Sequence, residues 1–162
     1  MSKQQSPGRE DLHLYLNDHL AGSVAAIELI DNLIEHHSED RFGKFFLDLR
    51  NEIYADQEKL RDLIRKIGSE ESAIRKASAW LAEKFSRAKF GTGDGVELLQ
   101  AVEGLALGIK GKELLWCSLE AVASNFPALQ GTDFGQLEKR AQDQLRRVED
   151  LRMELTREAF RA

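Results

Sequence analysis

The sequence predicts an all-α protein, a left-handed antiparallel four-helix bundle with one long crossover that contains a short extra helix. Apolar residues recur at steps of three and four nearly throughout the 162 residues, as they do on the buried face of a helix. No segment alternates apolar and polar residues as a half-buried strand would. Rows that mix steps of three and four predict the packing geometry of left-handed bundles.

Composition indicates a single domain. With 42% hydrophobic residues, 31% charged residues and two prolines, the chain can bury one sizeable core. The polar stretch MSKQQSPGR, residues 1–9, is expected to be a flexible tail, and residues 10–162 are expected to form one helical domain. That tail lacks the apolar centre of a secretory signal, and no apolar run reaches the roughly 18 residues of a membrane span. We therefore expect a cytoplasmic protein.

Charge and cysteine content exclude several classes of function. The net charge is −5, and acidic and basic side chains are interspersed along the chain. Because no basic stripe is present that could follow a phosphate backbone, we expect no nucleic-acid partner. Cys117 is the only cysteine, so this chain can form neither an intramolecular disulfide nor a zinc site built from several cysteines.

The first helix is expected over residues 10–37 and the second over residues 42–67. In each helix one row of residues forms the seam, meaning the row that faces the bundle interior. Gly68 follows the last turn of the second helix and is expected to cap it. The first seam is Leu16, Leu20, Ser23, Ile27, Ile30 and Ile34, and the second is Phe46, Leu49, Ile53, Asp56, Leu60, Leu63 and Ile67.

The crossover is expected to carry a short helix over residues 70–88. The stretch GSEESAIRKASAWLAEKFSRAKF begins with a capping signature at Ser69 and continues with amphipathic spacing. The loop GTGDG, residues 91–95, ends this segment. This loop is too short for a phosphate-binding loop and follows no strand, so we expect no nucleotide there.

The third helix is expected over residues 96–124 and the fourth over residues 133–160, with Thr132 or Asp133 as the cap of the fourth. Short turns join the first helix to the second and the third to the fourth. Residues 68–95 are long enough to carry the chain from one end of the bundle to the other. The third seam is Ala101, Leu105, Gly108, Lys112, Leu115, Leu119 and Val122, and the fourth is Leu137, Ala141, Gln144, Val148, Leu151 and Leu155.

Four segments resemble the four helices of bacterioferritin and related ferritin-like proteins. In chain order they are LNDHLAGSVAAIEL, YADQEKLRDLIRKIG, GLALGIKGKELLW and LEKRAQDQLRRVEDLR. The resemblance implies a ferritin-like bundle, in which two helical hairpins are joined by one long crossover. The crossover stretch AWLAEKFSRAKF resembles a bacterial subgroup of ferritin-like proteins, and that likeness brings no activity with it.

The same resemblance implies where a dinuclear metal site would lie, and this sequence lacks its ligands. In the family, one Glu from each of the first and third helices and a Glu-x-x-His pair from each of the second and fourth bind two iron or manganese ions. Of the matching residues only Asp56 is a good ligand for such a cation. We therefore expect no metal, no other cofactor and no enzymatic activity. The vacated positions are Ser23, Ile53, Asp56, Gly108, Ala141 and Gln144.

Glu28, Glu52 and Glu103 lie within a few residues of the vacated positions and could serve as displaced ligands. A shift of one residue turns a helical side chain by about 100° and would carry the apolar seam out of the core. We therefore expect these three glutamates to face solvent or an interface.

The other residues with reactive side chains predict no site. All four histidines lie in the first helix, where His36 and His37 are adjacent and point in different directions. We expect a polar helix end there, where a cation is favoured, instead of a shared metal. His19 is expected to pack at a flank of the seam, and Cys117 to be a half-buried packing residue without a nearby base.

Four polar residues sit on the seams at or next to the depth of the missing metal: Ser23, Asp56, Lys112 and Gln144. An unpaired buried charge there would cost several kcal/mol, so each needs a partner. One hypothesis is that Lys112 enters the space opened by Gly108 and neutralises Asp56, while Ser23 and Gln144 complete the hydrogen bonds. The alternative is that Lys112 turns outward and Asp56 reaches water.

These observations lead to three hypotheses for function. The first is a non-enzymatic bundle that binds itself or a protein partner, because the aromatic residues exceed what one seam can bury. The second is a metal-dependent oxidase or iron-storage protein with displaced ligands. The third is a small-ligand carrier with a pocket at the vacated centre. The aromatic residues in question are Phe42, Phe45, Phe46, Trp80, Phe85, Phe90 and Phe134.

Overall fold

The computed structural model describes residues 7–68 and 94–161. Within these ranges the chain forms four long helices and two short 3-10 helices, and no strands. The helix predicted over residues 70–88 and its cap at Ser69 lie outside the described residues. The elements are α1 (Pro7–His37), α2 (Gly43–Ile67), α4 (Val96–Val122), η1 (Ala123–Asn125), η2 (Pro127–Leu129) and α5 (Phe134–Ala159).

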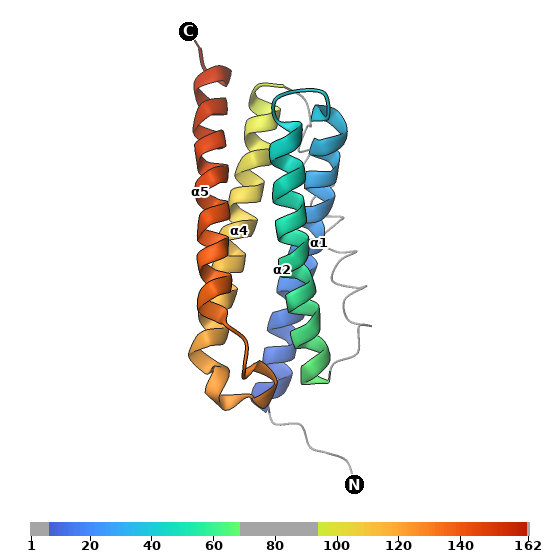
Figure 1. The fold of residues 1–162 in the computed structure, drawn as a ribbon, viewed down its shortest axis with the longest axis vertical. Coiled ribbons are helices and arrows are strands. Elements are labelled where there is room, and N and C mark those ends of the chain that lie inside the picture. The colour runs from blue at the N-terminus through green and yellow to red at the C-terminus, as the bar shows by residue number, and fades with distance from the viewer. Residues whose placement is uncertain (1–6, 69–93, 162) are drawn as a thin grey trace.

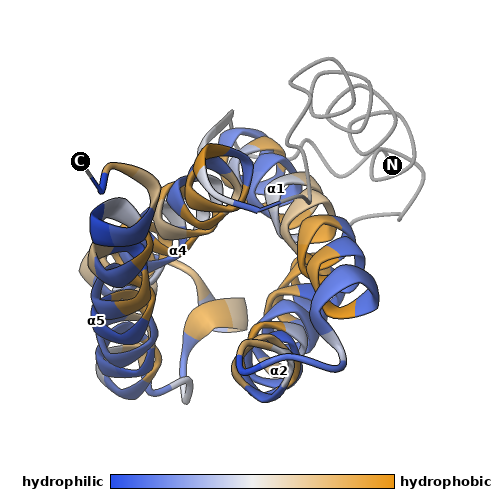
Figure 2. Cartoon of the chain, turned by 90° about the horizontal axis from the view of Figure 1, so that it is seen from above, coloured by the Kyte–Doolittle hydropathy of each residue, from blue (hydrophilic) through white to orange (hydrophobic). Residues whose placement is uncertain are grey.

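The four long helices lie side by side with their axes along the long dimension of the molecule (Figure 1). α1 and α2 run in opposite directions and are joined by a short turn. α4 and α5 also run in opposite directions, and the longer connection between them contains η1 and η2. Seen from above, the outer faces of α2 and α5 are largely hydrophilic (Figure 2). Among the described helices, none has a stretch long and apolar enough to cross a membrane.

α1 begins at Pro7, three residues before the start expected at residue 10. Proline is favoured in the first turn of a helix, because its missing N–H would have no partner there in any case. The guanidinium of Arg9 also donates to the carbonyl oxygen of Ile67, with Arg9 Nε 3.1 Å from it. This hydrogen bond ties the start of α1 to the end of α2, so residues 7–9 belong to the folded domain.

Two of the predicted caps have the expected geometry. Gly68 ends α2 in the left-handed conformation, with φ 82°, and its N–H contacts the carbonyl oxygens of Ile64 and Arg65. At the start of α5 the Asp133 carboxylate accepts a hydrogen bond from the Gln136 N–H at 2.9 Å, so Asp133 is the N-cap and Thr132 is not. α4 ends at Val122, two residues short of its predicted end, where the chain tightens into η1.

The predicted seams of α2 and α5 are buried at every position. Their apolar side chains join two apolar clusters, each of which contains residues from all four long helices. The first cluster includes Phe46, Ile53, Leu105 and Val148. The second includes Leu20, Leu63, Leu119, Leu137 and, from η2, Leu129.

The predicted seams of α1 and α4 are only partly buried. In α1, Ile27 and Ile34 are half-buried, while burial continues in steps of four through Ala21, Ala25, Leu29 and Leu33. In α4, Gly108 is exposed and its neighbour Ile109 is buried instead. Both helices are apolar over a wide arc, so periodicity does not single out one row of residues.

Candidate functional site

A polar layer divides the two apolar clusters. On α2 the clusters end at Ile53 and resume at Leu60, and Asp56 and Gln57 lie buried between them. Lys112 occupies the corresponding interval of α4, and the fully buried Gln144 occupies that of α5. The layer therefore crosses the bundle interior at mid-length.

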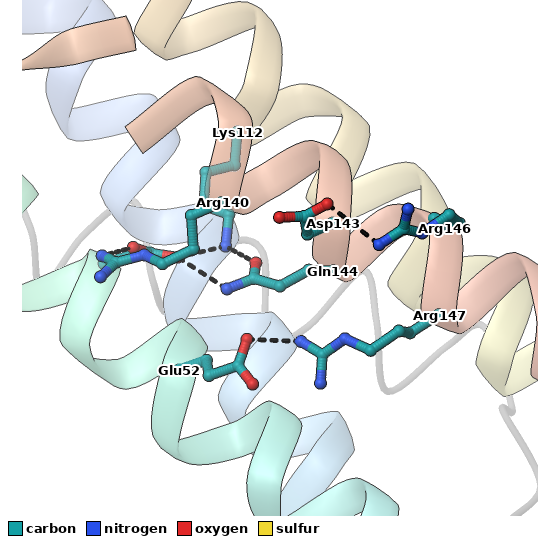
Figure 3. A network of polar contacts seen from close by, with 8 residues as sticks. Glu52, Lys112, Arg140, Asp143, Gln144, Arg146 and Arg147 are labelled. Carbon is teal, nitrogen blue, oxygen red and sulfur yellow. Dashed lines mark hydrogen bonds and ion pairs between the residues drawn. The ribbon is translucent and has the colours of Figure 1, made fainter. Parts of the chain in front are cut away.

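The Asp56 carboxylate is the acceptor at the centre of this layer, and its side chain is only 1% exposed. Lys112 Nζ donates to Asp56 Oδ2 at 2.5 Å, and Gln144 Nε2 donates to the same oxygen at 3.2 Å. Arg140 donates to Asp56 Oδ1, and Lys112 donates a second hydrogen bond to Gln144 Oε1. Figure 3 shows the side chains of Lys112, Arg140 and Gln144 reaching toward one another from α4 and α5.

The structure thus brings together Asp56, Lys112 and Gln144 and leaves Ser23 apart from them. Ser23 Oγ accepts a hydrogen bond from Gln57 Nε2 at 3.0 Å and donates to the Leu20 carbonyl oxygen at 2.7 Å. The reason is that Ser23 is half-buried at the edge of the core, where its hydroxyl satisfies the backbone of its own helix.

Two members of the polar layer, Arg140 and Gln57, were not anticipated from the sequence. Arg140 stands four residues before Gln144, and residues at this spacing lie on the same helical face. That spacing is the signal that could have identified it. Gln57 directly follows Asp56, which offers no comparable signal because consecutive residues of a helix point about 100° apart.

The charges of the groups around the buried Asp56 carboxylate do not sum to zero. Asp56 faces two cations, Lys112 and Arg140, so the three groups carry one net positive charge when all are ionised. Burial lowers the pKa of the Lys112 ammonium; the Asp56 carboxylate opposes that effect without cancelling it, and Arg140 adds to it. The charged form of Lys112 is therefore less favoured than in water despite its ion pair with Asp56.

Charged side chains also bridge α2 and α5 beyond this layer. Glu52 accepts from Arg147 at 2.5 Å, and Arg41, in the turn before α2, donates to Glu158 at 2.5 Å and to Glu154. Glu52 is therefore an interface residue of the bundle. Glu28 and Glu103, the other two glutamates next to the vacated positions, are exposed.

A cavity of about 440 Å³ adjoins the layer between α1, α2 and α4. Its polar wall includes Ser23, Asp56, Gln57 and Lys112, and its rim includes Tyr15, Asp18 and His19 of α1. Exposed residues such as Asp18 and Gly108 line it together with buried ones, so the cavity opens to the molecular surface. Its apolar wall includes Ile53, Leu60, Ile109 and Leu115.

Three helical glycines line this cavity: Gly22, Gly108 and Gly111. A Cβ atom added at any of the three would meet no other atom within 4 Å. Close packing therefore does not require glycine at these positions, although glycine inside a helix costs about 1 kcal/mol relative to alanine. Their common feature is that they widen the cavity wall.

Trp116 also lines the cavity, and its indole nitrogen is itself inaccessible to solvent. The residue is 1% exposed, and its indole Nε1 is buried with no hydrogen-bond acceptor in the part of the chain that the structure describes. A buried N–H without a partner costs stability.

Several single residues differ from their predicted surroundings. Cys117 is exposed instead of half-buried, because it falls between the buried Trp116 and Leu119 on the outer side of α4. His37 is buried at the end of α1, where its Nδ1 lies 2.6 Å from Asp40 Oδ2. Although desolvation alone would raise the pKa of Asp40, its hydrogen bonds with His37 and the Phe42 N–H hold that pKa below its usual value.

His36 and His19 lie apart from these contacts. His36 is exposed, and its Nδ1 contacts the carbonyl oxygen of Asn32 within its own helix. His19 packs edge to face against Tyr15, with ring centroids 4.7 Å apart. Burial lowers the pKa of His19, and the nearby Asp18 opposes that shift.

The aromatic residues that suggested an interface are packed inside the bundle where the structure describes them. Phe46 and Phe134 are buried, and Phe42 and Phe45 pack against the first apolar cluster. Trp80, Phe85 and Phe90 lie outside the described residues. The four described residues therefore form no exposed aromatic surface, and the protein-binding hypothesis stays a prediction.

The vacated positions do not fit a dinuclear metal centre. Asp56 is the one carboxylate among them, and both of its oxygens accept hydrogen bonds from Lys112, Arg140 or Gln144. Ile53 and Ala141 are buried apolar residues without ligand atoms. Across the described ranges, no three His, Cys, Asp or Glu side chains are grouped closely enough to hold a metal ion.

Comparison with known proteins does not assign this site. No protein-family model matches the chain, and neither curated proteins nor solved structures gave a match.

Proposed function

We propose that this chain is a non-catalytic bundle of the ferritin-like type that binds a small, largely apolar molecule in the cavity between α1, α2 and α4. The cavity is the observation that carries the proposal. Its volume of about 440 Å³ lies in the range of small-molecule sites, and such sites combine an apolar wall with a few fixed polar groups.

The ferritin-like assignment draws support from the arrangement of the helices. α1 and α2 form one hairpin, α4 and α5 form the other, and α2 and α4 run in the same direction (Figure 1). A connection along the length of the bundle is needed between two parallel helices, and residues 69–93 supply that length of chain. On this proposal, the polar layer occupies the place that the metal centre has in ferritin-like proteins.

The glycines favour ligand binding over a purely structural role. Gly22, Gly108 and Gly111 lower helix stability and gain no packing in return. A bundle that served only as a scaffold would be more stable with alanine at each position. An open cavity mouth that admits a ligand accounts for all three residues.

A neutral fluorescent probe tests the proposal. N-phenylnaphthylamine is apolar and uncharged, and its fluorescence rises when it leaves water, so titration of the protein with this probe reports binding to apolar sites. The wild-type chain is expected to bind it. In the double variant Gly108→Leu, Gly111→Leu, two leucine side chains occupy part of the cavity, and we expect at least roughly tenfold weaker binding.

Ser118→Leu is the matched control, because Ser118 is exposed on α4 and does not line the cavity. It adds a leucine to the same helix and should leave binding unchanged. Circular dichroism verifies that all variants are folded. Absence of binding to the wild-type chain, or equal binding by the filled variant, would show that the cavity is not a ligand site.

A further inference from the structure

Asp18 is an acidic residue of the cavity wall whose charge no other lining residue compensates. The lining residues that carry full charges are Asp18, Asp56 and Lys112. Lys112 Nζ lies 2.5 Å from Asp56 Oδ2, so these two charges offset each other. Asp18 has no ion-pair partner in the part of the chain that the structure describes. The charges of the wall therefore sum to one negative charge, which α1 supplies at the rim.

Two other basic groups near the cavity leave this charge in place. Arg140 contacts Asp56 but does not line the cavity, and its side chain is 39% exposed, so solvent screens its charge. His19 directly follows Asp18 and lines the cavity. Burial lowers the pKa of His19, and Asp18 opposes that shift without cancelling it. At neutral pH the imidazole is therefore uncharged and does not neutralise Asp18.

Tyr15 adds an aromatic ring to the same rim. Tyr15 and Asp18 stand three residues apart on α1, and side chains at this spacing lie on the same face of a helix. The Tyr15 ring packs edge to face against His19, with ring centroids 4.7 Å apart. The face of an aromatic ring attracts a cation, and a carboxylate accepts charge-assisted hydrogen bonds from one. A rim of this composition favours an organic ammonium ion over a neutral or anionic head group.

The buried part of the wall fits an apolar body. Ile53, Leu60 and Leu115 are buried aliphatic residues of α2 and α4. A hydrocarbon chain placed against them gains the free energy of removing apolar surface from water. The Lys112 ammonium, which also lines the cavity, would repel a second cation, so the head group of an amine is directed away from the polar layer and toward the rim.

We propose that the ligand of this cavity is an amphiphilic amine, whose ammonium group binds at the rim beside Asp18 and Tyr15 and whose hydrocarbon body lies against the buried wall. This inference rests on the proposed function, because it names the class of ligand that the cavity takes. The single positive charge of an ammonium ion matches the single negative charge of the wall. A carboxylate head group would meet Asp18 as a like charge.

Octylammonium, octanol and octanoate form a matched set of probes, since they share a chain and differ in the head group. Each is used to displace bound N-phenylnaphthylamine at neutral pH and low ionic strength. With the wild-type chain we expect octylammonium to displace the probe at a concentration about fivefold lower than octanol does, in line with an exposed ion pair and a cation–π contact. Octanoate should require the highest concentration.

Substitution of Asp18 assigns this preference to the rim. The preference is the ratio of the two displacing concentrations within one variant, so a change in affinity for the fluorescent probe cancels. In Asp18→Asn the side chain keeps its shape and loses its charge, and most of the preference for octylammonium should disappear. Asp11→Asn is the matched control, because Asp11 is an exposed aspartate of the same helix that does not line the cavity. Both variants change the net charge of the chain equally.

Two substitutions at Tyr15 isolate the contribution of its ring. Tyr15→Phe keeps the ring and should retain the preference for octylammonium. Tyr15→Leu keeps an apolar side chain without the ring and should lower the preference about twofold. An unchanged preference in Tyr15→Leu would overturn the role assigned to the ring.

The outcomes separate this inference from the proposed function. Probe binding with equal displacement by octylammonium and octanol would overturn the amine inference and leave the ligand cavity in place. A preference that survives in Asp18→Asn, or that Asp11→Asn lowers equally, would also overturn it, because the attraction would then come from elsewhere on the acidic chain. A wild-type chain that binds neither the probe nor octylammonium would contradict both the inference and the proposed function.

Discussion

We expect removal of the Asp56 carboxylate and removal of the Lys112 ammonium from the polar layer to have unequal effects on the free energy of unfolding. In Asp56→Asn the side chain keeps its shape and loses its charge, so the Lys112 ammonium remains in the interior without a counter-ion. Its side chain is 13% exposed, and the cavity beside it is its route to water. Removing one partner of a buried ion pair costs about 3–5 kcal/mol.

We expect a value near the lower end of that range, about 3 kcal/mol, for Asp56→Asn. Arg140 is the other partner of Asp56, and its side chain is 39% exposed, so it can turn into solvent and adds little to the cost. Lys112→Met has a different effect. It leaves Asp56 with Arg140 and Gln144, and it replaces a buried ammonium with an apolar chain of similar length.

For Lys112→Met the lost hydrogen bond to a charged group is worth about 1.5–3 kcal/mol, and the relief from desolvation offsets most of it. The expected net change is therefore below about 1 kcal/mol. Urea unfolding followed by far-ultraviolet circular dichroism measures both values, provided that the slopes against urea agree. The double variant is expected to be more stable than the sum of the two single effects predicts, by about 2 kcal/mol.

This reasoning fails if Asp56→Asn costs no more than Lys112→Met. Equal losses would mean that water reaches both groups and that the layer is solvated. Additive effects in the double variant would mean that the two side chains do not interact in solution, although their atoms lie 2.5 Å apart in the structure.

Three further predictions concern pH and the glycines. Burial lowers the pKa of Lys112 below the ordinary 10.5, so between the folded and unfolded pKa values the unfolded chain binds more protons. The free energy of unfolding of the wild-type chain should therefore rise relative to that of Lys112→Met as the pH increases toward 10.5. A difference between the two chains that stays constant with pH would contradict the lowered pKa. Gly108→Ala should raise the free energy of unfolding by about 1 kcal/mol in urea titrations, since its Cβ would meet no atom; a loss would reveal packing against this glycine. Gly43→Ala should lower the free energy of unfolding by about 2 kcal/mol in the same assay, because its Cβ would lie 2.6 Å from the His37 carbonyl oxygen. The control Gly135→Ala, whose Cβ would have no contact closer than 3.6 Å, should be neutral or stabilising.

Much of the helical structure and half of the seams could be predicted from the sequence. α2 and α5 are strongly amphipathic, so one row of residues stands out in each helix. The row of α2 includes Asp56, and the row of α5 includes Gln144. Pairing between Asp56 and Lys112 could be proposed because a buried carboxylate needs a cation, and Lys112 was the one basic residue on any of the four seams. These inferences follow from periodicity and from the energetics of buried charge.

The cavity and its rim could not be predicted in the same way. α4 is apolar on nearly all sides, so Gly108 and Ile109 were equally plausible interior residues by periodicity, and the structure buries Ile109. Arg140 was missed because a long side chain can reach the interior from a position beside the seam. Whether three helices leave a space between them depends on helix separation, which the order of residues does not specify.

The polar layer also restricts how the four helices can be aligned along their axes. Contacts between apolar side chains are not directional, so a core made only of them can accommodate a helix that is shifted along its axis by one turn, about 5.4 Å. Here such a slip of α4 would carry the Lys112 ammonium toward one of the apolar clusters and leave Asp56 with fewer donors. We expect that penalty to select a single alignment of the bundle. The polar residues of the interior would then also determine the shape of the cavity beside them, because a slipped helix would no longer bring Gly22, Gly108 and Gly111 to one cavity wall.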